Sequence, residues 1–378
     1  MPPRLSRAVE VVPGLALSVA VMLAADAAAK RLGAVVLSLE GLDPAGRASP
    51  VSGISMAIVL GLLVANTTGV ARVFRPGLQF AVRRMLRLGI ILVGIRLSVF
   101  DVLKLGAWGL PVVATIVAVA LVTATAIARL LRVSNNLGTL AAASTAICGV
   151  TAALSVGPVI EAEEQETAYT VANVTLFGLV AMLSYPYLAH ALFAGRSGSA
   201  GLFLGTGIHD TSQVMGAALS YRDLFRDDGA FRVATVTKLT RNVFLVAVVP
   251  LLAYLHARRT GHEGRRIRLA KLFPVFVLGF LAMAIARSVG DAGIAAGGLA
   301  YGTWNASGWL GLTKTIGETS GTAALGTAMG GVGLSTDLRT LRAMGWRPLY
   351  LGALAAILVA LLALALAAAV GPHLTPAA

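Results

Sequence analysis

Long apolar runs, separated by short segments rich in arginine, recur from one end of the chain to the other. A run of about 20 apolar residues can cross the hydrocarbon core of a bilayer as a helix, and a helix satisfies its own backbone hydrogen bonds there. The pattern therefore predicts an all-α polytopic membrane protein with about 11 transmembrane helices. The predicted spans are residues 9–29, 52–70, 80–100, 107–131, 138–157, 165–190, 200–220, 231–257, 270–289, 318–337 and 346–370.

The composition fits an integral membrane protein. The chain is 57% hydrophobic and 13% charged, whereas soluble domains are about 45–50% apolar and about 25% charged. We therefore expect one integral membrane domain over residues 1–378, with a first span and loop at 1–51, a first repeat at 52–190 and a second at 200–378. The N-terminal segment resembles a signal peptide, but because spans continue after it, we expect an uncleaved first helix.

The net charge of +14 is better explained by the orientation of the chain in the membrane than by binding to nucleic acid. Most Lys and Arg residues fall in short loops between spans, where positive charge marks the cytoplasmic side. Their distribution predicts a cytoplasmic N-terminus and an external C-terminus. We therefore expect lipid as the surrounding partner and no nucleic acid. The single cysteine excludes an internal disulfide and a multi-cysteine metal site.

The chain also contains a weak internal repeat. LGIILVGIRLS at Leu88–Ser98 resembles LGTAMGGVGLS at Leu325–Ser335, and at the same spacing Pro111 matches Pro348. In the predicted topology the two segments cross the bilayer in opposite directions, which is typical of the inverted repeats of secondary transporters. A second register pairs the fifth span with the tenth. The sequence does not decide between the registers, and chance similarity between Gly/Leu-rich helices is the alternative.

Two basic residues lie deep inside one apolar span. Lys238 and Arg241 belong to the stretch Phe231–Leu255, and Arg241 is roughly 13–15 Å along that helix. A cation at the centre of a bilayer costs at least about 2.5–3.5 kcal/mol and is usually paired, hydrated or functional. Spaced i, i+3, the two side chains share a helix face, so we expect them to line a cavity and bind an anion. Alternatively, Lys238 reaches the headgroups.

The fifth span, residues 138–157, is crowded with small and hydroxyl side chains at its centre. We expect its helix to be interrupted near Ala146–Thr151, so that the second half points free N–H groups and a positive dipole end at an anion. The alternative is close packing of small residues against a neighbouring helix. The candidate substrate-binding residues here are Ser144, Thr145, Cys148, Gly149 and Thr151.

The tenth span, residues 318–337, is rich in glycine. Because glycine weakens a helix interior, we expect a second unwound segment opposite the first. A tight crossing through the groove of a neighbouring helix is the compatible alternative. At its start, Thr319, Ser320 and Thr322 are candidate substrate-binding residues, and Glu318 is a candidate for proton coupling or charge balance.

The seventh span, residues 200–220, carries His209, Asp210 and Gln213 near its middle. Intramembrane His and Asp side chains often relay protons, and histidine titrates near neutral pH. We therefore expect proton coupling or charge balance here, with Asp210 able to pair with a buried cation. In the alternative interpretation Asp210 caps a short half-helix whose first turn holds Gln213.

Four segments together resemble the sulfate exporter family of YeiH-like bacterial inner-membrane proteins. They are TAICGVTAA at Thr145–Ala153, GTGIHDTSQVMGAA at Gly205–Ala218, KLTRN at Lys238–Asn242 and GLSTDLRTLRAMGWRPL at Gly333–Leu349. With the span pattern, the resemblance covers nearly the whole chain. The family pattern favours serine where this chain has Ala146 and Thr151, so one hydroxyl is missing, which bears on the substrate more than on the fold.

The resemblance implies a fold like that of cation/proton antiporters and bile-acid transporters, with inverted repeats and two broken helices that cross. It also implies export of a small sulfur oxyanion such as sulfate or sulfite by alternating access. We expect H⁺ or Na⁺ as the coupling ion, and a homodimer remains open. A cation/proton antiporter that uses Asp210 and Glu318 is the alternative transporter.

Other classes of function find little support in the sequence. GxxxxGK[ST] is absent, which argues against ATP-driven transport, and so is HExxH. We therefore expect a protein that is not an enzyme and has no cofactor or metal. A passive channel and an intramembrane Ser/Lys or His/Asp hydrolase are the remaining alternatives; the hydrolase requires a serine within hydrogen-bond reach of its base.

Overall fold

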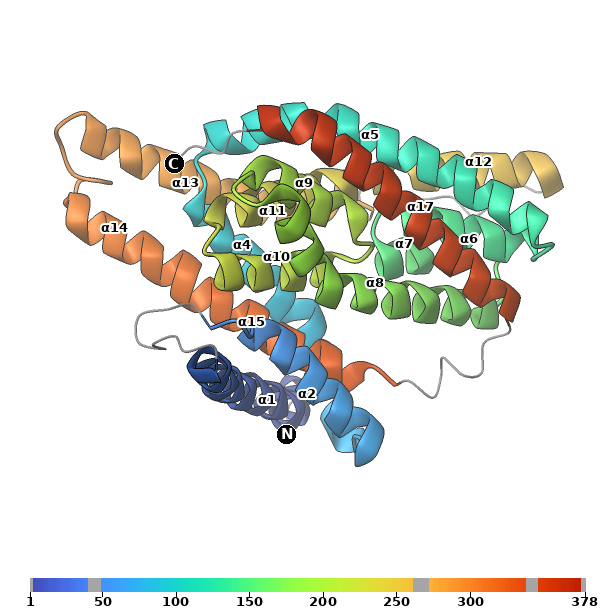
Figure 1. Cartoon of the computed structure of the whole chain (residues 1–378), viewed down its shortest axis with the longest axis horizontal. Coiled ribbons are helices and arrows are strands. Elements are labelled where there is room, and N and C mark those ends of the chain that lie inside the picture. Colours follow the sequence, from blue (N-terminus) through green and yellow to red (C-terminus); the bar gives the residue numbers. More distant parts are fainter. Residues whose placement is uncertain (1–2, 40–48, 261–271, 338–345, 375–378) are drawn as a thin grey trace. The chain divides into compact units, whose positions relative to one another are not determined.

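The computed structural model describes residues 3–39, 49–260, 272–337 and 346–374 of the chain (Figure 1). In these ranges the regular structure is helical, apart from one isolated bridge between Ala300 and Trp304. The prediction of an all-helical chain is confirmed for this part of it. The segments 261–271, 338–345 and 375–378 lie outside the described residues, and with them several loop cations of the topology prediction and part of the Gly333–Leu349 motif.

In the described part of the chain, six helices are long and apolar enough to cross a membrane, which agrees with a polytopic membrane protein. They are Glu10–Leu39, Val99–Leu130, Glu164–Phe193, Asp228–Thr260, Phe276–Ala295 and Trp346–His373. Helix α2 (Gly53–Thr67) is apolar but shorter. The other predicted spans consist of shorter or interrupted helices, so the total of eleven stays a prediction.

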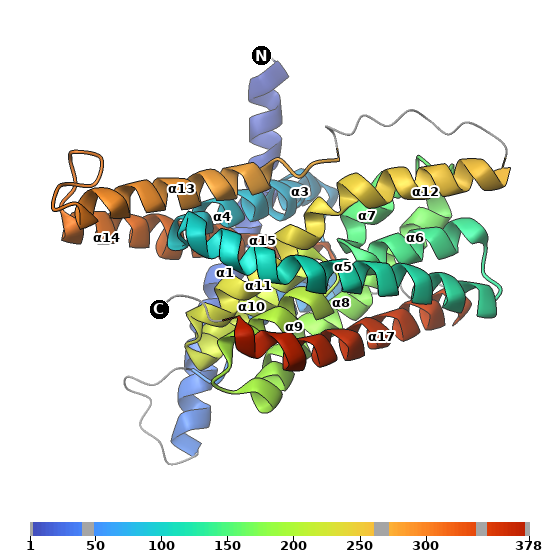
Figure 2. The same ribbon diagram turned by 90° about the horizontal axis from the view of Figure 1, so that it is seen from above.

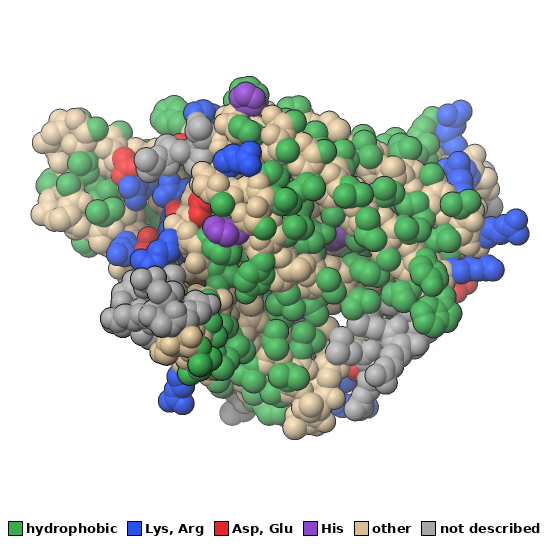
Figure 3. All heavy atoms as spheres, in the orientation of Figure 1, with side chains coloured by type: hydrophobic (Ala, Val, Ile, Leu, Met, Phe, Trp, Pro, Cys, Tyr) green, Lys and Arg blue, Asp and Glu red, His purple; other side chains and the backbone are tan. Residues whose placement is uncertain are grey.

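The outward-facing side chains of these helices are largely hydrophobic. On the face in Figure 3, hydrophobic side chains cover the area over α8 (Glu164–Phe193) and α17 (Trp346–Val370), while Lys and Arg lie at the right-hand end and, among Asp and Glu, on the left. Leu188 on α8 and Leu361 on α17 are among the exposed ones. Such a surface suits lipid, since a large apolar patch is rare on soluble monomers.

The chain divides into two compact units. The first unit comprises residues 1–104, 222–226 and 275–337, and the second comprises 105–221, 227–274 and 338–378. Helices of the first unit are α1 (Pro3–Leu39), α2, η1 (Arg72–Phe74), α3 (Arg75–Phe80), the π-helical η2 (Ala81–Met85), α4 (Leu86–Val93), η3 (Gly94–Arg96), α13 (Phe276–Ala295), α14 (Ala306–Lys314), the π-helical η5 (Thr315–Ser320) and α15 (Gly321–Ser335).

The second unit holds the rest of the chain's helices. They are α5 (Val99–Leu130, its first turn counted with the first unit), α6 (Asn135–Ala146), α7 (Gly149–Val156), α8, α9 (Ser197–Gly207), α10 (Thr211–Phe225, its last turn counted with the first unit), α11 (Asp228–Val243), α12 (Leu245–Thr260), α17 and η6 (Gly371–His373). Figure 2 shows α5 and α17 running beside each other. Small side chains let them approach α6 closely, as in the cluster Ala124, Ala142 and Ala355.

The predicted interruption of the tenth span is wrong. Helix α14, η5 and α15 follow one another without a gap from Ala306 to Ser335, and Figure 1 shows them as one long rod. The glycines serve a close crossing instead: a methyl group on Gly333 would overlap the Ile58 carbonyl oxygen of α2, and one on Gly330 would lie 2.7 Å from the Ser18 carbonyl oxygen of α1. Glycine at a packed interface therefore permits close backbones without unwinding the helix.

Candidate functional site

The fifth span is broken where the sequence predicts it. Helix α6 ends at Ala146, and the backbone of Ile147 (φ −121°, ψ −85°) and Cys148 (φ −143°, ψ 57°) is not helical. Helix α7 then begins at Gly149, whose φ is +33°. A side chain at positive φ is strained, so glycine suits this turn. The predicted break near Ala146–Thr151 is confirmed.

The second break lies in the seventh span and not in the tenth. Helix α9 ends at Gly207, Ile208 is extended (φ −99°, ψ 137°), and α10 begins at Thr211. Asp210 caps α10, because its Oδ1 accepts from the Ser212 backbone N–H at 2.9 Å. Gln213 completes the cap, since its Oε1 accepts from the Asp210 N–H at 3.2 Å. Asp210 is therefore the N-cap of α10, with Gln213 in its first turn, as in the alternative interpretation of Asp210.

The two breaks touch each other inside the second unit. Cys148 Sγ lies 3.1 Å from Thr211 Oγ1, and Asn242 Nδ2 of α11 donates to the same hydroxyl at 3.0 Å. Asp210 also lies beside the other break, since a methyl group on Gly149 would be 3.5 Å from Asp210 Oδ2. The N-terminal ends of α7 and α10 therefore flank one carboxylate, which both positive dipole ends stabilise.

Lys238 is fully buried, and its ammonium group binds the carbonyl ends of both breaks. Its Nζ donates to the carbonyl oxygens of Ile147 at 3.1 Å and Ile208 at 3.2 Å, and also to that of His209. An ammonium has three N–H donors, so all three are used. Among the described residues, no ion pair joins Lys238 to a carboxylate.

Arg241, one helical turn further along α11, is fully buried and binds the same two breaks. Its Nε donates to the Ala146 carbonyl oxygen and its Nη1 to that of Thr206, both at 2.7 Å. Further bonds go from Nη1 to the Ile208 carbonyl oxygen at 3.3 Å and from Nη2 to that of Thr145. The carbonyl end of a helix carries a partial negative charge, so both cations compensate the ends of α6 and α9.

This arrangement differs from the expected cavity lined by cations. Lys238 and Arg241 have no exposed surface, and their donors go to the backbone at the breaks. The pairing of Asp210 with either cation is not found among the described ion pairs. The physical reason is that six carbonyl oxygens freed by the breaks already satisfy the cations, and a buried carbonyl without a partner is costly. Direct contact of either cation with a substrate stays a prediction.

A narrow cleft beside the breaks receives the side chain of His209. Its polar lining comes from Thr145 on α6, Thr170 and Asn173 on α8, and His209. Two buried atoms of this lining, His209 Nδ1 and Asn173 Oδ1, have no hydrogen-bond partner. The Asn173 amide nitrogen is used, because it donates to the Pro348 carbonyl oxygen at 2.5 Å. Unpartnered buried polar atoms call for an ordered water or a ligand group.

The other candidates of the fifth span lie close to the break. Ser144 is buried and its Oγ has no hydrogen-bond partner, whereas Thr151 is exposed in the first turn of α7. The candidates predicted in the tenth span belong to the first unit and lie in a continuous helix. Thus the structure brings together Ser144, Thr145, Cys148, Gly149, Thr151, His209, Asp210, Gln213, Lys238 and Arg241 around the two breaks of the second unit.

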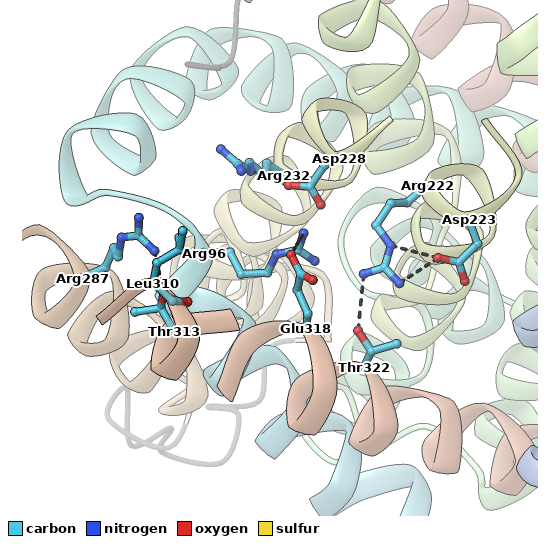
Figure 4. Close-up of polar contacts among 10 residues, drawn as sticks. All are labelled: Arg96, Arg222, Asp223, Asp228, Arg232, Arg287, Leu310, Thr313, Glu318 and Thr322. Atoms are coloured by element: carbon cyan, nitrogen blue, oxygen red, sulfur yellow. Dashed lines mark hydrogen bonds and ion pairs between the residues drawn. The ribbon is translucent and has the colours of Figure 1, made fainter. Parts of the chain in front are cut away.

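In the first unit, the tenth-span candidates contact arginines (Figure 4). Arg96 Nη2 lies 3.3 Å from Glu318 Oε1, and Arg222 Nη1 donates to Thr322 Oγ1 at 3.3 Å. Arg222 also binds Asp223 through Nε and Nη2. Thr319 and Ser320 are exposed. Each arginine is therefore paired with a carboxylate, Arg96 with Glu318 and Arg222 with Asp223, as is usual in a structural ion-pair network.

Three residues at the breaks were missed by sequence reasoning. Thr211 contacts Cys148 and so joins the two breaks, and the Ser212 hydroxyl donates to Asp210. Asn173 lines the cleft. The signal for the second break was present: glycines at 205 and 207 precede an Asp-x-x-Gln spacing, which is typical of a helix start. Within the described residues, no group of three or more His, Cys, Asp or Glu side chains is placed to hold a metal ion.

Comparison with known proteins places the chain in a family. A family model described as conserved hypothetical protein 698 matches residues 14–352. A UPF0324 membrane protein of Nitratidesulfovibrio vulgaris is 31% identical over 290 residues, which are 74% of this chain and 76% of the relative. Those of Bacillus cereus (29% identical, covering 84% and 86%) and Oceanobacillus iheyensis (33%, covering 62% and 68%) are also similar. No solved structure matches. The chain, with its two broken helices, belongs to the UPF0324 family of membrane proteins.

Proposed function

We propose that the protein is a secondary transporter that exports a small inorganic sulfur oxyanion, such as sulfate or sulfite, by alternating access. The observation that carries the proposal is the meeting of two helix breaks, with Cys148 Sγ 3.1 Å from Thr211 Oγ1. Helices broken in mid-span, with N-terminal ends directed at an anionic group, form the binding sites of many transporters. Export and the sulfur oxyanion come from the resemblance to the sulfate exporter family.

The electrostatics of the breaks favour an anion as the substrate. Each break frees one carbonyl end and one N–H end. Lys238 and Arg241 bind the carbonyl ends of α6 and α9, whereas the positive N-terminal ends of α7 and α10 share the single carboxylate of Asp210. Backbone N–H groups at helix N-termini bind sulfate and phosphate readily. The compensated breaks therefore form a net positive site.

Asp210 acts in this proposal as the resident anion of the empty site. Its carboxylate caps α10 and lies beside Gly149 at the start of α7. An incoming oxyanion competes with that carboxylate for the same N–H groups, so Asp210 must be protonated or displaced when the substrate binds. Proton coupling follows from this competition, with His209 in the adjoining cleft as the second titratable group.

The hydroxyl groups around the breaks complete the proposed substrate site. Thr145, Ser144 and Thr151 flank the first break, and Gln213 holds the cap of the second. Hydroxyl donors suit an oxyanion because each supplies one hydrogen bond without fixing a charge. The roles predicted for the tenth span stay proposals, and they concern the first unit alone. These are substrate binding by Thr319, Ser320 and Thr322, and proton coupling or charge balance by Glu318.

We also propose that the eleven-span topology contains an inverted repeat in the first of the two registers. In both of its members the matched segment begins within a helix that directly follows a π-helical stretch: η2 precedes α4, and η5 precedes α15. Pro111 and Pro348, matched at the same spacing, lie within α5 and α17. The second register pairs a broken helix with a continuous one, which argues against it. The division into two compact units supports alternating access.

The N-terminus is proposed to face the cytoplasm of a bacterial inner membrane, with the C-terminus outside. The argument is the loop-charge distribution. Alkaline phosphatase fused at the C-terminus should be active and green fluorescent protein dark; the reverse result excludes this topology. The same fusions in detergent allow the homodimer to be tested by size-exclusion chromatography with light scattering.

A cation/proton antiporter is the second candidate, because a carboxylate, Asp210, lies at the breaks. In that case Asp210 binds a cation in exchange for a proton. The two positive helix ends beside it oppose a cation, and Lys238 and Arg241 add to the opposition. The first candidate therefore fits the charges better. Neither function includes a chemical step or a cofactor.

Counterflow in proteoliposomes tests the function. Vesicles loaded with unlabelled sulfate, sulfite, thiosulfate or a small sulfonate should take up labelled sulfate transiently, with saturation and stimulation from the opposite side. Protein-free vesicles are the blank, and saturation separates a carrier from a channel. Proton movement driven by Na⁺ without anion exchange would instead establish the antiporter. Absence of counterflow with every anion would contradict the proposal.

A further inference from the structure

The carbonyl oxygens at the two breaks converge on two points, and a cationic side chain of α11 occupies each. The Lys238 ammonium donates to the carbonyl oxygens of Ile147, Ile208 and His209. The Arg241 guanidinium donates to those of Ala146, Thr206, Ile208 and Thr145. Both side chains have no exposed surface, and no described carboxylate pairs with either. The counter-charge to these cations is backbone oxygen.

Backbone oxygens in this arrangement are also ligands for alkali-metal ions. Unwound carbonyls and half-helix C-terminal ends coordinate Na⁺ in transporters, and carbonyl oxygens alone coordinate K⁺ in channels. An ammonium group with all three hydrogens on carbonyl oxygens takes the place of such an ion. At Lys238 two of these contacts measure 3.1 and 3.2 Å, which leaves no room for a second cation.

The ammonium must carry its charge to fill this role. A neutral amine has two N–H donors and a lone pair, so one of the three carbonyls of Ile147, Ile208 and His209 would face a lone pair. The three acceptors therefore select the protonated form of Lys238. A covalently attached cation, unlike a free ion, cannot leave or be exchanged across the membrane.

We propose that Lys238 Nζ is a tethered replacement for an alkali-metal ion at the helix breaks. The folded state is then independent of Na⁺ and K⁺, and removal of the amine opens a site for a monovalent cation. That site is formed by the carbonyl oxygens of Ile147, Ile208 and His209. A corollary, which rests on the proposed transport function, is that these breaks bind no coupling metal ion.

Thermal unfolding of the purified full-length protein in detergent tests this without any substrate. The midpoint is measured in NaCl, KCl and choline chloride at equal ionic strength. The unsubstituted protein should give one midpoint in all three salts. Lys238→Ala should unfold at a lower temperature in choline chloride and recover several degrees, saturably, in NaCl or KCl.

Lys238→Met is the matched control. Methionine fills the space of the lysine stem but supplies no charge, so this variant should be destabilised to the same extent in all three salts. If Lys238→Ala cannot be purified, Lys238→Thr carries the same test, because its hydroxyl adds one oxygen ligand to the carbonyls.

Three results would overturn the proposal. The first is a higher unfolding midpoint of the unsubstituted protein in NaCl or KCl than in choline chloride. The second is an unfolding midpoint that is the same in all three salts for both Lys238→Ala and Lys238→Thr. The third is failure of both variants to fold in any salt. Displaceable binding of radioactive Na⁺ to the unsubstituted protein would contradict the corollary. A protein without anion transport would leave the unfolding result intact, so the two proposals fail separately.

Discussion

Cys148 Sγ lies 3.1 Å from Thr211 Oγ1, and this contact joins the two helix breaks. Cys148 is the last residue before α7, and Thr211 is the first residue of α10. Asn242 of α11 donates to the same threonine hydroxyl. The half-helices are thus linked to each other and to the helix that carries both buried cations. A movement of one break should therefore displace the other.

Removal of the Thr211 hydroxyl should loosen this link. Thr211→Val keeps the shape of the side chain but leaves the Asn242 amide without its acceptor, and hydrogen bonds between membrane helices average about 0.6 kcal/mol with a maximum near 1.7. We expect a loss of about 1 kcal/mol in the free energy of unfolding. Cys148→Ser retains a hydrogen bond and should be nearly neutral. A larger loss in Cys148→Ser than in Thr211→Val would contradict the assigned contact.

The single cysteine also makes the break observable. Cys148 is 4% exposed, so a maleimide should label the native protein slowly and the denatured protein at once. If the substrate opens the contact with Thr211, sulfate or sulfite should change the labelling rate, while chloride at the same ionic strength should not. Fast labelling of the native protein would show that the break is open to water in the resting state.

Arg241 should contribute more to stability than any arginine on the surface of α11. Arg241→Ala leaves the carbonyl oxygens of Ala146 and Thr206 without donors, and each buried polar group left unsatisfied costs about 1–3 kcal/mol. The matched control is Arg232→Ala on the same helix. Arg232 forms a partly exposed i, i+4 pair with Asp228, and such pairs contribute less than about 1 kcal/mol. Equal unfolding midpoints for the two variants would contradict the assigned role.

The sequence predicted some features of the breaks because their causes are local. The hydroxyl and glycine residues around Cys148 and Gly149 weaken a helix wherever they occur, and the break is found there. Asp210 caps α10 with Gln213 in the first turn, as in the alternative interpretation drawn from their spacing. The depth of Lys238 and Arg241 followed from the apolar run that surrounds them.

Other features could not be predicted because their causes are tertiary. The glycines of α15 look like those of a break, and only the neighbouring α1 and α2 show that they allow a close crossing. Likewise, the sequence shows that two cations are buried but not what they bind. Carbonyl oxygens leave no trace in a sequence, since every residue has one, so the sequence does not reveal them as partners of Lys238 and Arg241.

The close crossing of α15 and α2 should be sensitive to one methyl group. A methyl group on Gly333 would overlap the Ile58 carbonyl oxygen, and overpacking costs about 1–3 kcal/mol. Gly333→Ala should therefore lower the unfolding midpoint. Gly311→Ala on α14 is the control, because no atom lies within 4 Å of the added methyl group, and it should gain up to about 1 kcal/mol from helix propensity. Equal effects would contradict the crossing.

A substitution on the neighbouring helix α8 should disturb the cap of α10. Gly178 leaves the space that the Gln213 amide fills, and a methyl group there would overlap the amide. Gly178→Ala should therefore displace Gln213 and remove its bonds to the Asp210 N–H and the Thr175 carbonyl oxygen. We expect the transport defect of Gly178→Ala to resemble that of Gln213→Ala. Gly109→Ala on α5, where the added methyl group meets nothing within 4 Å, should transport normally.

Asp210→Asn separates the structural role of the carboxylate from its charge. Asparagine caps a helix about as well as aspartate, so the unfolding midpoint should change by less than the equivalent of about 1 kcal/mol. The variant lacks the resident anion and its titratable proton. We therefore expect transport to be lost, or to continue without the pH dependence of the unsubstituted protein, as measured by counterflow at several pH values.

Asp227→Asn is the control for this variant. Asp227 caps α11 through the Ala230 N–H at 2.8 Å, so it undergoes the same chemical change at a helix start that is not part of either break. Its transport should keep the pH profile of the unsubstituted protein. If Asp210→Asn also kept that profile with full activity, the carboxylate would be only a helix cap, and the competition between Asp210 and the substrate would have to be abandoned.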